Sequence, residues 1–408
     1  MIFPEIQFAP NLINMDNRSS GAMKVLRVAS DIYPDTPGGI GIHVHEMSKH
    51  QSLMGCDVTV VTSITSSNCK RYEERDGYHI VRIPTPVRML GNSFQIGLIS
   101  YLLENRSKFD VIHAHSHLFY STNVTAMLRK TGGPPLVITN HGVFSTSASG
   151  MLQDLYFPAV GSPTLRAADA VLCYTEADRD KIMEFGVRED HIKVIHNGID
   201  SSLFTPGSGK SEVPQVLWIG RMVKGKGLVY LIEAFRKLKN KGIVFKAVLV
   251  GRGPDLELVQ QLLSQYELKD QVRLISIIDQ GSAVQLYRES TVFALPSVSE
   301  GMPRTLLESM SCGTPFVCTD LPQLVDLAVG CGITAGYGDV EGIADGLERY
   351  LTDKAIADEH GKHGRQKVLD HYSWKETVSH TVDVYHELVD GPHKNPPQNK
   401  PHPLPKDV

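Results

Sequence analysis

The sequence predicts an α/β protein of two domains, each built on a parallel sheet. Its 408 residues exceed what a single hydrophobic core usually holds. Short apolar runs alternate with helical segments along the chain, and a stretch rich in glycine, serine and proline interrupts this alternation at residues 197–215. Strand–helix alternation indicates parallel strands joined by crossover helices, and the interruption indicates a linker between two domains.

The strand candidates before the interruption are short, rich in β-branched residues and bounded by turn residues. They are Val25–Ala29, Val58–Val61, Ile80–Ile83, Val111–Ala114, Leu136–Thr139, Ala170–Tyr174 and Lys193–Ile195. Helical segments lie between them, such as Gly41–Leu53 and Ala177–Phe185. We therefore expect an N-terminal Rossmann-like domain over residues 24–205.

The same alternation restarts after the interruption. The second set of strand candidates comprises Val216–Ile219, Ala247–Val250, Val272–Ile275, Val292–Leu295 and Phe316–Cys318. A second Rossmann-like domain is expected over residues 206–373. Because ligands of such sheets bind beyond the carboxyl ends of the strands, the expected site is a cleft between the two domains.

Composition limits the partners and the location. The formal net charge of −4 provides no basic field for nucleic acid. Six cysteines without a Cys-x-x-Cys pair indicate free thiols in a reducing cytoplasm, and no apolar run reaches the length of a membrane span. Residues 1–23 lack the pattern of a signal peptide and are expected to form a disordered extension. Residues 390–408, rich in proline and polar residues, are expected to form a disordered tail.

Two glycine-containing segments follow predicted strands. The segment from Pro37 to Gly41 opens a helix, so it either holds a phosphate at the helix N-terminus or forms a plain turn. The segment from Gly220 to Gly227 contains Arg221 and Lys226, which are suited to phosphate oxygens. It does not match the Walker A pattern, and the alternative is a basic surface loop.

A third segment carries two acids around a glycine–proline loop. Glu300 and Gly301 precede Pro303, which suits the first position of a helix, and Glu308 lies within that helix. Glu300 can accept hydrogen bonds from sugar hydroxyls, and the N–H groups near Gly301 can face a diphosphate. For Glu308 the alternative is a solvated position on a helix surface.

Histidines form two further groups. His113, His115 and His117 would share one face of a strand, which makes a metal site conceivable, although no acidic partner is evident. His141 ends another strand, where a lone histidine is more often structural than catalytic.

Taken together, these segments resemble the family-four retaining glycosyltransferases (glycosyltransferase group 1 type), which have the GT-B fold. The matching segments occur in the family's order from about residue 24 to residue 390. They are PGGIGIHV, HAH, TNHG, HNGID, GRMVKGKG, VGRGP and LPSVSEGMPRTLLESMSCGTPFV. The resemblance implies two Rossmann-like domains with parallel sheets facing across a cleft. It also implies that the helix near residues 374–389 crosses back to the N-terminal domain.

The resemblance implies a role for each matching residue. Arg221 and Lys226 would hold the diphosphate of the donor, and Glu300 would contact the hydroxyls of the transferred sugar. His141 would lie near that sugar, on the acceptor domain. The donor-binding positions would be Gly39, Gly41, Gly301, Met302, Pro303 and Glu308, with Glu308 on the ribose.

The expected function is retaining transfer of a hexose or N-acetylhexosamine from a nucleotide-diphosphate sugar, without metal or cofactor. A UDP-sugar is favoured as donor and GDP-mannose comes next. The acceptor would be a lipid-linked molecule, a glycan or a small molecule, and a lipid acceptor would require contact at the inner membrane surface. The alternatives are a nucleotide-sugar epimerase, a phosphorylase with pyridoxal phosphate and a non-catalytic sugar-binding protein. An acceptor-free assay and an absorption spectrum would separate the first two from a transferase.

Overall fold

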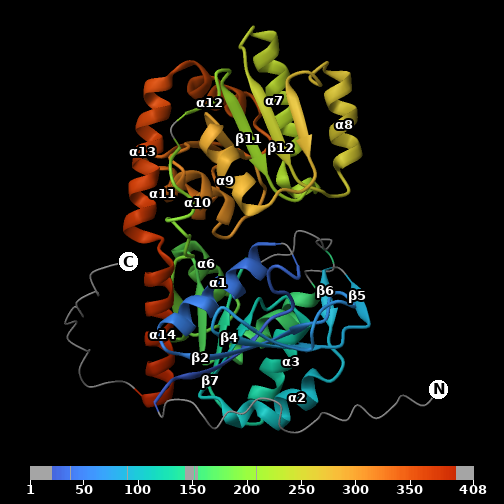
Figure 1. Cartoon of the computed structure of the whole chain (residues 1–408), viewed down its shortest axis with the longest axis vertical. Helices are drawn as coiled ribbons and strands as arrows, with labels where there is room; N and C mark the ends of the chain where they lie inside the picture. Colours follow the sequence, from blue (N-terminus) through green and yellow to red (C-terminus); the bar gives the residue numbers. More distant parts are fainter. Residues whose placement is uncertain are drawn as a thin grey trace.

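The computed structural model describes residues 21–36, 38–89, 91–142, 151, 155–207 and 209–391. The chain forms two α/β domains, which appear as two lobes in Figure 1. Most of the predicted extension and tail, at residues 1–20 and 392–408, and Pro37 of the first glycine segment lie outside the described residues. Met23, by contrast, is part of the fold, because its carbonyl accepts a hydrogen bond from the Asp57 amide (2.9 Å).

The N-terminal domain is built on an eight-stranded sheet. Its order is β10 (Ile192–Val194), β9 (Ala170–Cys173), β8 (Leu136–Thr139), β7 (Val111–His115), β1 (Lys24–Val28), β2 (Asp57–Ser63), β4 (Tyr78–Ile83) and β3 (Tyr72–Arg75). All neighbouring pairs are parallel except β3 with β4. The predicted strands are confirmed with ends displaced by at most two residues, whereas β3 and the hairpin of β5 (Val87–Met89) and β6 (Asn92–Phe94) were not predicted.

Helices cover both faces of this sheet. One face packs against α2 (Leu98–Asn105), α3 (Tyr120–Arg129), α5 (Ser162–Arg166) and α6 (Glu176–Glu184). The other face packs against α1 (Gly39–Leu53) and α14 (Trp374–Asp390). The strands are mostly apolar on both faces, as expected for parallel strands with helices on each side, but the face toward α1 and α14 also carries Arg27, His113 and His115.

The C-terminal domain repeats this architecture with a six-stranded sheet. Its order is β13 (Val272–Ile275), β12 (Lys246–Val250), β11 (Gln215–Ile219), β14 (Val292–Leu295), β15 (Phe316–Thr319) and β16 (Gly332–Ala335), and all its neighbouring pairs are parallel. The predicted strands are again confirmed, whereas β16 was missed because it contains glycine and only one β-branched pair.

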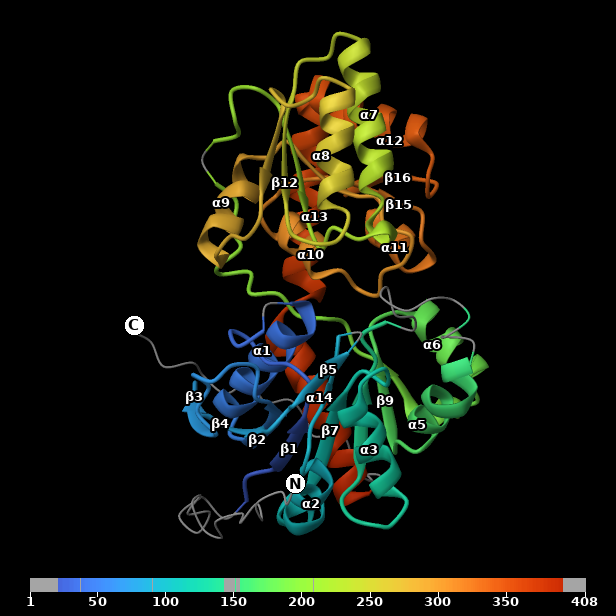
Figure 2. The same cartoon turned by 90° about the vertical axis from the view of Figure 1, so that its right-hand side faces the viewer.

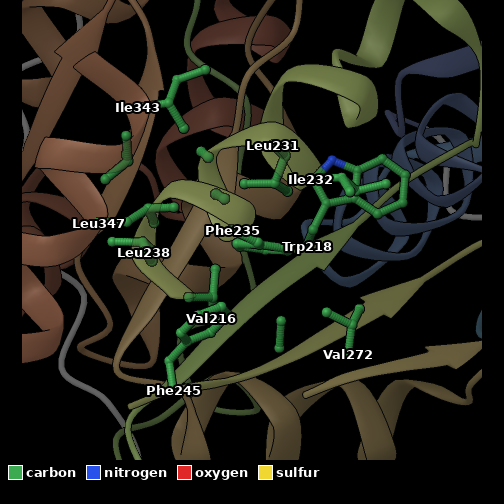
Figure 3. Close-up of a cluster of buried hydrophobic side chains, with 14 of the residues drawn as sticks. Val216, Trp218, Leu231, Ile232, Phe235, Leu238, Phe245, Val272, Ile343 and Leu347 are labelled. Atoms are coloured by element: carbon green, nitrogen blue, oxygen red, sulfur yellow. The ribbon is translucent and has the colours of Figure 1, made fainter. Parts of the chain in front are cut away.

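The core of this domain also lies in two layers. Figure 3 shows the layer in which Trp218 and Phe235 pack between β11 and the covering helices. That layer includes α7 (Leu228–Asn240), α8 (Leu256–Gln265) and α12 (Val340–Thr352). The opposite layer includes α9 (Gln280–Glu289), α10 (Arg304–Ser311), α11 (Pro322–Ala328) and α13 (Lys354–His371).

The last helix, α14, returns to the N-terminal domain. Figures 1 and 2 show it along the lower lobe although it follows the upper lobe in sequence. Val384 and Tyr385 are buried in the core of the N-terminal domain. At the crossing point Ser373 pairs with Ile199 in an isolated parallel bridge. Two chain segments, the linker and the start of α14, therefore connect the domains at one place.

Candidate active site between the two domains

The carboxyl ends of strands from both domains meet at one place. A Cβ atom built on Gly301 would lie 3.6 Å from the carbonyl oxygen of His141 and 3.7 Å from the amide nitrogen of Gly142. Gly301 follows β14 of the C-terminal domain, and His141 follows β8 of the N-terminal domain. The structure thus brings together the two predicted segments that were expected to face each other across the cleft.

Tight loops position the basic residues of the C-terminal domain. Gly227 has a φ of 66°, and a Cβ atom there would clash with the carbonyl oxygen of Pro296. The loop after β11 can therefore approach the loop after β14 only with glycine at this position. Lys226 lies in the short turn just before Gly227, and Arg221 is exposed at the start of the same loop.

Lys226 and Glu300 form an ion pair across these two loops. The Lys226 Nζ and the Glu300 Oε1 are 2.5 Å apart, with side-chain exposures of 20% and 11%. A pair this enclosed is stronger than a surface pair, because less water screens it. The two residues that were predicted to hold the diphosphate and the sugar are thus direct neighbours.

Glu308 is engaged by two side chains rather than solvated. Its carboxylate accepts hydrogen bonds from the Tyr287 hydroxyl (2.9 Å) and from the Arg304 Nε (2.8 Å), and the residue is only 8% exposed. The alternative of a solvated helix surface is therefore wrong for Glu308. A ligand that reaches this carboxylate would meet an acceptor already held in a fixed orientation.

In the loop before α10, a ligand would meet backbone groups rather than the side chain of Met302. The Met302 side chain is packed in the core of the C-terminal domain at 7% exposure. Pro303 has a ψ of 116° and immediately precedes α10, which begins at Arg304, one residue later than predicted. A ligand at this loop would therefore contact peptide groups and Gly301.

The two glycines of the first segment differ in their surroundings. A Cβ atom on Gly41 would lie 3.0 Å from the carbonyl oxygen of Thr36 and 3.2 Å from the amide nitrogen of Tyr33, so Gly41 is required for packing within its own domain. A Cβ atom on Gly39 would meet nothing within 4 Å. Gly39 is the first residue of α1, where amide groups lack partners within the helix. Of the two, Gly39 is the position open to a ligand.

The predicted face of three histidines is wrong for His117. The strand β7 ends at His115, and Ser116 then adopts a φ of 63°, which ends the alternation of side chains. His117 turns away and its Nδ1 lies 3.1 Å from the Asn140 Oδ1. His113 and His115 do share a face, with ring centroids 4.6 Å apart.

His115 instead belongs to a buried cluster that includes two residues not predicted from the sequence, Arg27 and His43. Its Nδ1 lies 3.0 Å from the Nε2 of His141, and its Nε2 lies 2.7 Å from a terminal nitrogen of Arg27. His43 of α1 packs edge-on against His141, with ring centroids 4.8 Å apart. Arg27 could have been identified from the sequence, because a charged residue within an apolar strand at the sheet centre requires a buried polar partner.

Burial lowers the pKa of each histidine in this cluster. The pKa of His43 falls to about 3, chiefly because burial disfavours the charged form, while a hydrogen bond with Asn197 acts in the opposite direction. Burial also places the pKa of His115 and of His141 well below the ordinary value, and the charge of Arg27 contributes in the same direction. The imidazoles are therefore neutral near pH 7.

The ring nitrogens of His43, His115 and His141 lie within 4.8 Å of one another, close enough to consider a metal ion. Two of these nitrogens, however, already share a hydrogen bond, and the Arg27 cation contacts His115 directly. A divalent cation here would be placed against a buried positive charge. The cluster is therefore better suited to a network of hydrogen bonds.

Two family models match adjacent parts of the chain, which together cover residues 37–367. "Glycosyltransferase Family 4" matches residues 37–203 and "Glycosyl transferases group 1" matches residues 204–367. Among the curated relatives, a GDP-mannose:cellobiosyl-diphosphopolyprenol alpha-mannosyltransferase of Xanthomonas oryzae is 24% identical over 90% of this chain and 97% of its own. A glycogen synthase of Mycobacterium tuberculosis is 25% identical over 89% of this chain and 94% of its own.

Solved structures agree with this fold. The sucrose-phosphate synthase of Thermosynechococcus elongatus superposes with a TM-score of 0.78 at 21% identity, over 91% of this chain and 100% of its own. The Anabaena protein HepE, solved in complex with UDP, superposes with a TM-score of 0.73 at 17% identity, over 90% of this chain and 100% of its own. No helix among the described residues is long and apolar enough to cross a membrane. The chain belongs to the family-four, group 1 glycosyltransferases and has their GT-B fold.

Proposed function

We propose that this enzyme transfers a hexose or N-acetylhexosamine from a nucleotide-diphosphate sugar to a hydroxyl group, with retention at the anomeric carbon and without a metal ion. The observation that carries this proposal is the Lys226–Glu300 ion pair, in which Glu300 directly precedes Gly301, the residue that faces the N-terminal domain. The cation would turn to the donor diphosphate, and the carboxylate would turn to the hydroxyls of the sugar.

The proposed catalysis is electrostatic. Breaking the bond between sugar and phosphate increases the negative charge on the diphosphate leaving group. Arg221, Lys226 and the open N-terminus of α1 at Gly39 would stabilise that charge. Positive groups fixed in the protein can supply what a bound divalent cation supplies in other enzymes, which is why we propose metal-independent transfer.

Retention would follow from attack on the same face of the sugar that the phosphate leaves, with a phosphate oxygen accepting the proton of the acceptor hydroxyl. A covalent intermediate on Glu300 is the less favoured route. The contact with Lys226 supports this order, because a carboxylate paired with a cation is a weaker nucleophile. Glu308, held by Tyr287 and Arg304, would accept hydrogen bonds from the ribose.

Donor and acceptor are proposed from the relatives. HepE was solved with UDP, and the mannosyltransferase of Xanthomonas is named for GDP-mannose and a diphosphopolyprenol acceptor. We propose a UDP-sugar as the first donor to test and GDP-mannose as the second. A lipid-linked acceptor would bring the enzyme to a membrane surface from the cytoplasmic side.

Calorimetric titration with UDP, GDP and ADP, followed by turnover of the matching sugar nucleotides, tests this function. The expected result is selective binding of one nucleotide and transfer that requires an acceptor. Conversion of the sugar nucleotide to an isomer without acceptor would establish an epimerase instead. Binding of none of the three nucleotides would remove the proposed donor site.

A further inference from the structure

Arg27 is a fully buried cation on the central strand β1. It pairs in register with His113 of β7, so its side chain lies on the face that carries His113 and His115. Its polar contacts include the side chains of His113, His115, Gln51 and Tyr385, none of which carries a negative charge. Burying an ion without a counter-ion is energetically unfavourable, so this arrangement calls for an explanation beyond packing.

The chemistry of arginine gives the network a direction. A guanidinium group only donates hydrogen bonds, so the His115 Nε2, 2.7 Å from Arg27, must be unprotonated. Neutral His115 then carries its proton on Nδ1 and donates it to the His141 Nε2 at 3.0 Å. His141 in turn carries its proton on Nδ1 and donates to the Tyr174 hydroxyl at 2.8 Å.

A second branch of the network agrees with this direction. The Gln51 Oε1 accepts from Arg27, and the Gln51 amide group donates to the Tyr385 hydroxyl at 3.1 Å. That hydroxyl therefore donates to the Nδ1 of His113, whose Nε2 lies 2.7 Å from the Thr139 hydroxyl. All these bonds can form at once with His113 and His115 neutral, as their low pKa values require.

The network ends at the interface between the domains. Both ring nitrogens of His141 are occupied, by His115 and by Tyr174, so the imidazole is not available as an acid or base for the sugar. The part of His141 that faces the C-terminal domain is its peptide group, with the carbonyl oxygen 3.6 Å from the position of a Cβ atom on Gly301. The hydrogen bonds of the ring to His115 and Tyr174 thus restrain the residue whose peptide group faces Gly301.

We propose that Arg27 is a positioning residue, which fixes the tautomer of His141 through His115 and so holds the 141–142 peptide group against the Gly301 loop. The consequence for catalysis rests on the proposed glycosyl transfer. Arg27 touches neither donor nor acceptor in this scheme. Loss of Arg27 would displace the 141–142 peptide group relative to the donor, while the donor-binding residues of the C-terminal domain stay in place.

An isosteric pair of variants at the middle of the network tests the tautomer. His115→Asn can place an amide N–H where His115 Nδ1 lies, and His115→Asp can place only an acceptor there. In the full chain labelled with ¹⁵N in its histidines, imidazole nitrogen shifts report which nitrogen is protonated, and His141→Gln assigns the signal. We expect the wild-type and His115→Asn proteins to carry the His141 proton on Nδ1, and His115→Asp to place a proton on Nε2. A wild-type His141 protonated on Nε2, or equal spectra for the two variants, would overturn the proposal.

Kinetics of the full chain test the consequence. Arg27→Met should lower kcat about tenfold or more with an unchanged KM for the donor, since small misplacements of this kind are costly. Arg27→Lys, which can still donate to His115, should recover part of kcat. A rise in donor KM with unchanged kcat would contradict a positioning role.

If Arg27→Met fails to fold, the tautomer of His141 in the two His115 variants still tests the proposal. The nitrogen shifts need no substrate, so failure of the proposed function, seen as no transfer by the wild-type protein, is distinguishable from failure of this inference.

Discussion

The two sides of the cleft are built on different electrostatic principles. On the side of the C-terminal domain, full charges are paired, Lys226 with Glu300 and Arg304 with Glu308. In the histidine cluster of the N-terminal domain, neutral imidazoles surround one cation, Arg27, and their hydrogen bonds run in a single direction. Paired charges can exchange one partner for a phosphate or a hydroxyl, whereas a directed network of neutral rings sets geometry. We therefore assign affinity for the donor to the first side and alignment to the second.

The largest expected effect comes from removing the cation of the first pair. Lys226→Ala should reduce transfer on the order of 100- to 1,000-fold, about 3–4 kcal/mol in the barrier, because the leaving diphosphate loses a fixed positive group. Steady-state transfer rates measure this loss. Lys224→Ala is the matched control, since Lys224 lies in the same turn and is exposed. Similar rates for both variants would remove Lys226 from the donor site.

The second pair should matter for stability as well as for binding. In Glu308→Ala the Arg304 guanidinium, 9% exposed, loses its carboxylate, and the free energy of unfolding should fall by about 3 kcal/mol, as for a broken buried pair. Glu308→Gln keeps an acceptor for the Tyr287 hydroxyl, so its free energy of unfolding should fall by less. Urea unfolding of both variants measures the difference. Equal stability of the alanine variant and the wild-type protein would show that the pair is screened as on a surface.

The neutral, buried histidines of the N-terminal domain should make the free energy of unfolding depend on pH. The pKa of His43 is about 3 in the folded protein, lowered by burial, and about 6.5 in the unfolded chain. Between these values the unfolded state binds the extra proton, so the stability from neutral His43 is complete above pH 6.5 and is lost as the pH falls toward 3. At pH 5 the loss is about 2 kcal/mol.

His43→Asn isolates this contribution, because asparagine can still donate to Asn197 but does not titrate. The free energy of unfolding of this variant should fall less between pH 7 and pH 5 than that of the wild-type protein, by about 2 kcal/mol. The control is His386→Asn, at an exposed histidine of α14. The idea fails if both variants follow the pH dependence of the wild-type protein.

The difference between the two sides also explains what the sequence could predict. The strands were found because each is a compact run of β-branched residues, and the donor segment was found because Glu300, Gly301 and Glu308 are close together in the chain. The network of Arg27, His115 and His141 draws on strands that are far apart in sequence and adjacent only in the sheet order β8–β7–β1. Without that order, a charged residue in a strand and scattered histidines carry no geometric meaning.

Local conformation accounts for two further differences. The face of three histidines depended on strict alternation, which Ser116 ends with its positive φ, a conformation that serine seldom adopts. The solvated alternative for Glu308 was wrong because its burial depends on Tyr287, which is 21 residues away on α9. Both features are set by tertiary contacts rather than by the local pattern.

The smallest expected effects come from Gly39 and Gly41 in the loop of the N-terminal domain. One glycine is required for packing, and the other is open to a ligand. Gly41→Ala would press its methyl group against the backbone of Thr36 and Tyr33 and should destabilise the fold by about 1 kcal/mol. Gly39→Ala enters open space at the first residue of α1 and should leave stability unchanged or slightly raised. If the donor diphosphate approaches Gly39 closely, however, the added methyl group should raise the donor KM severalfold. A variant Gly39→Ala with unaltered KM would place the diphosphate away from α1 and leave its binding to the C-terminal domain alone.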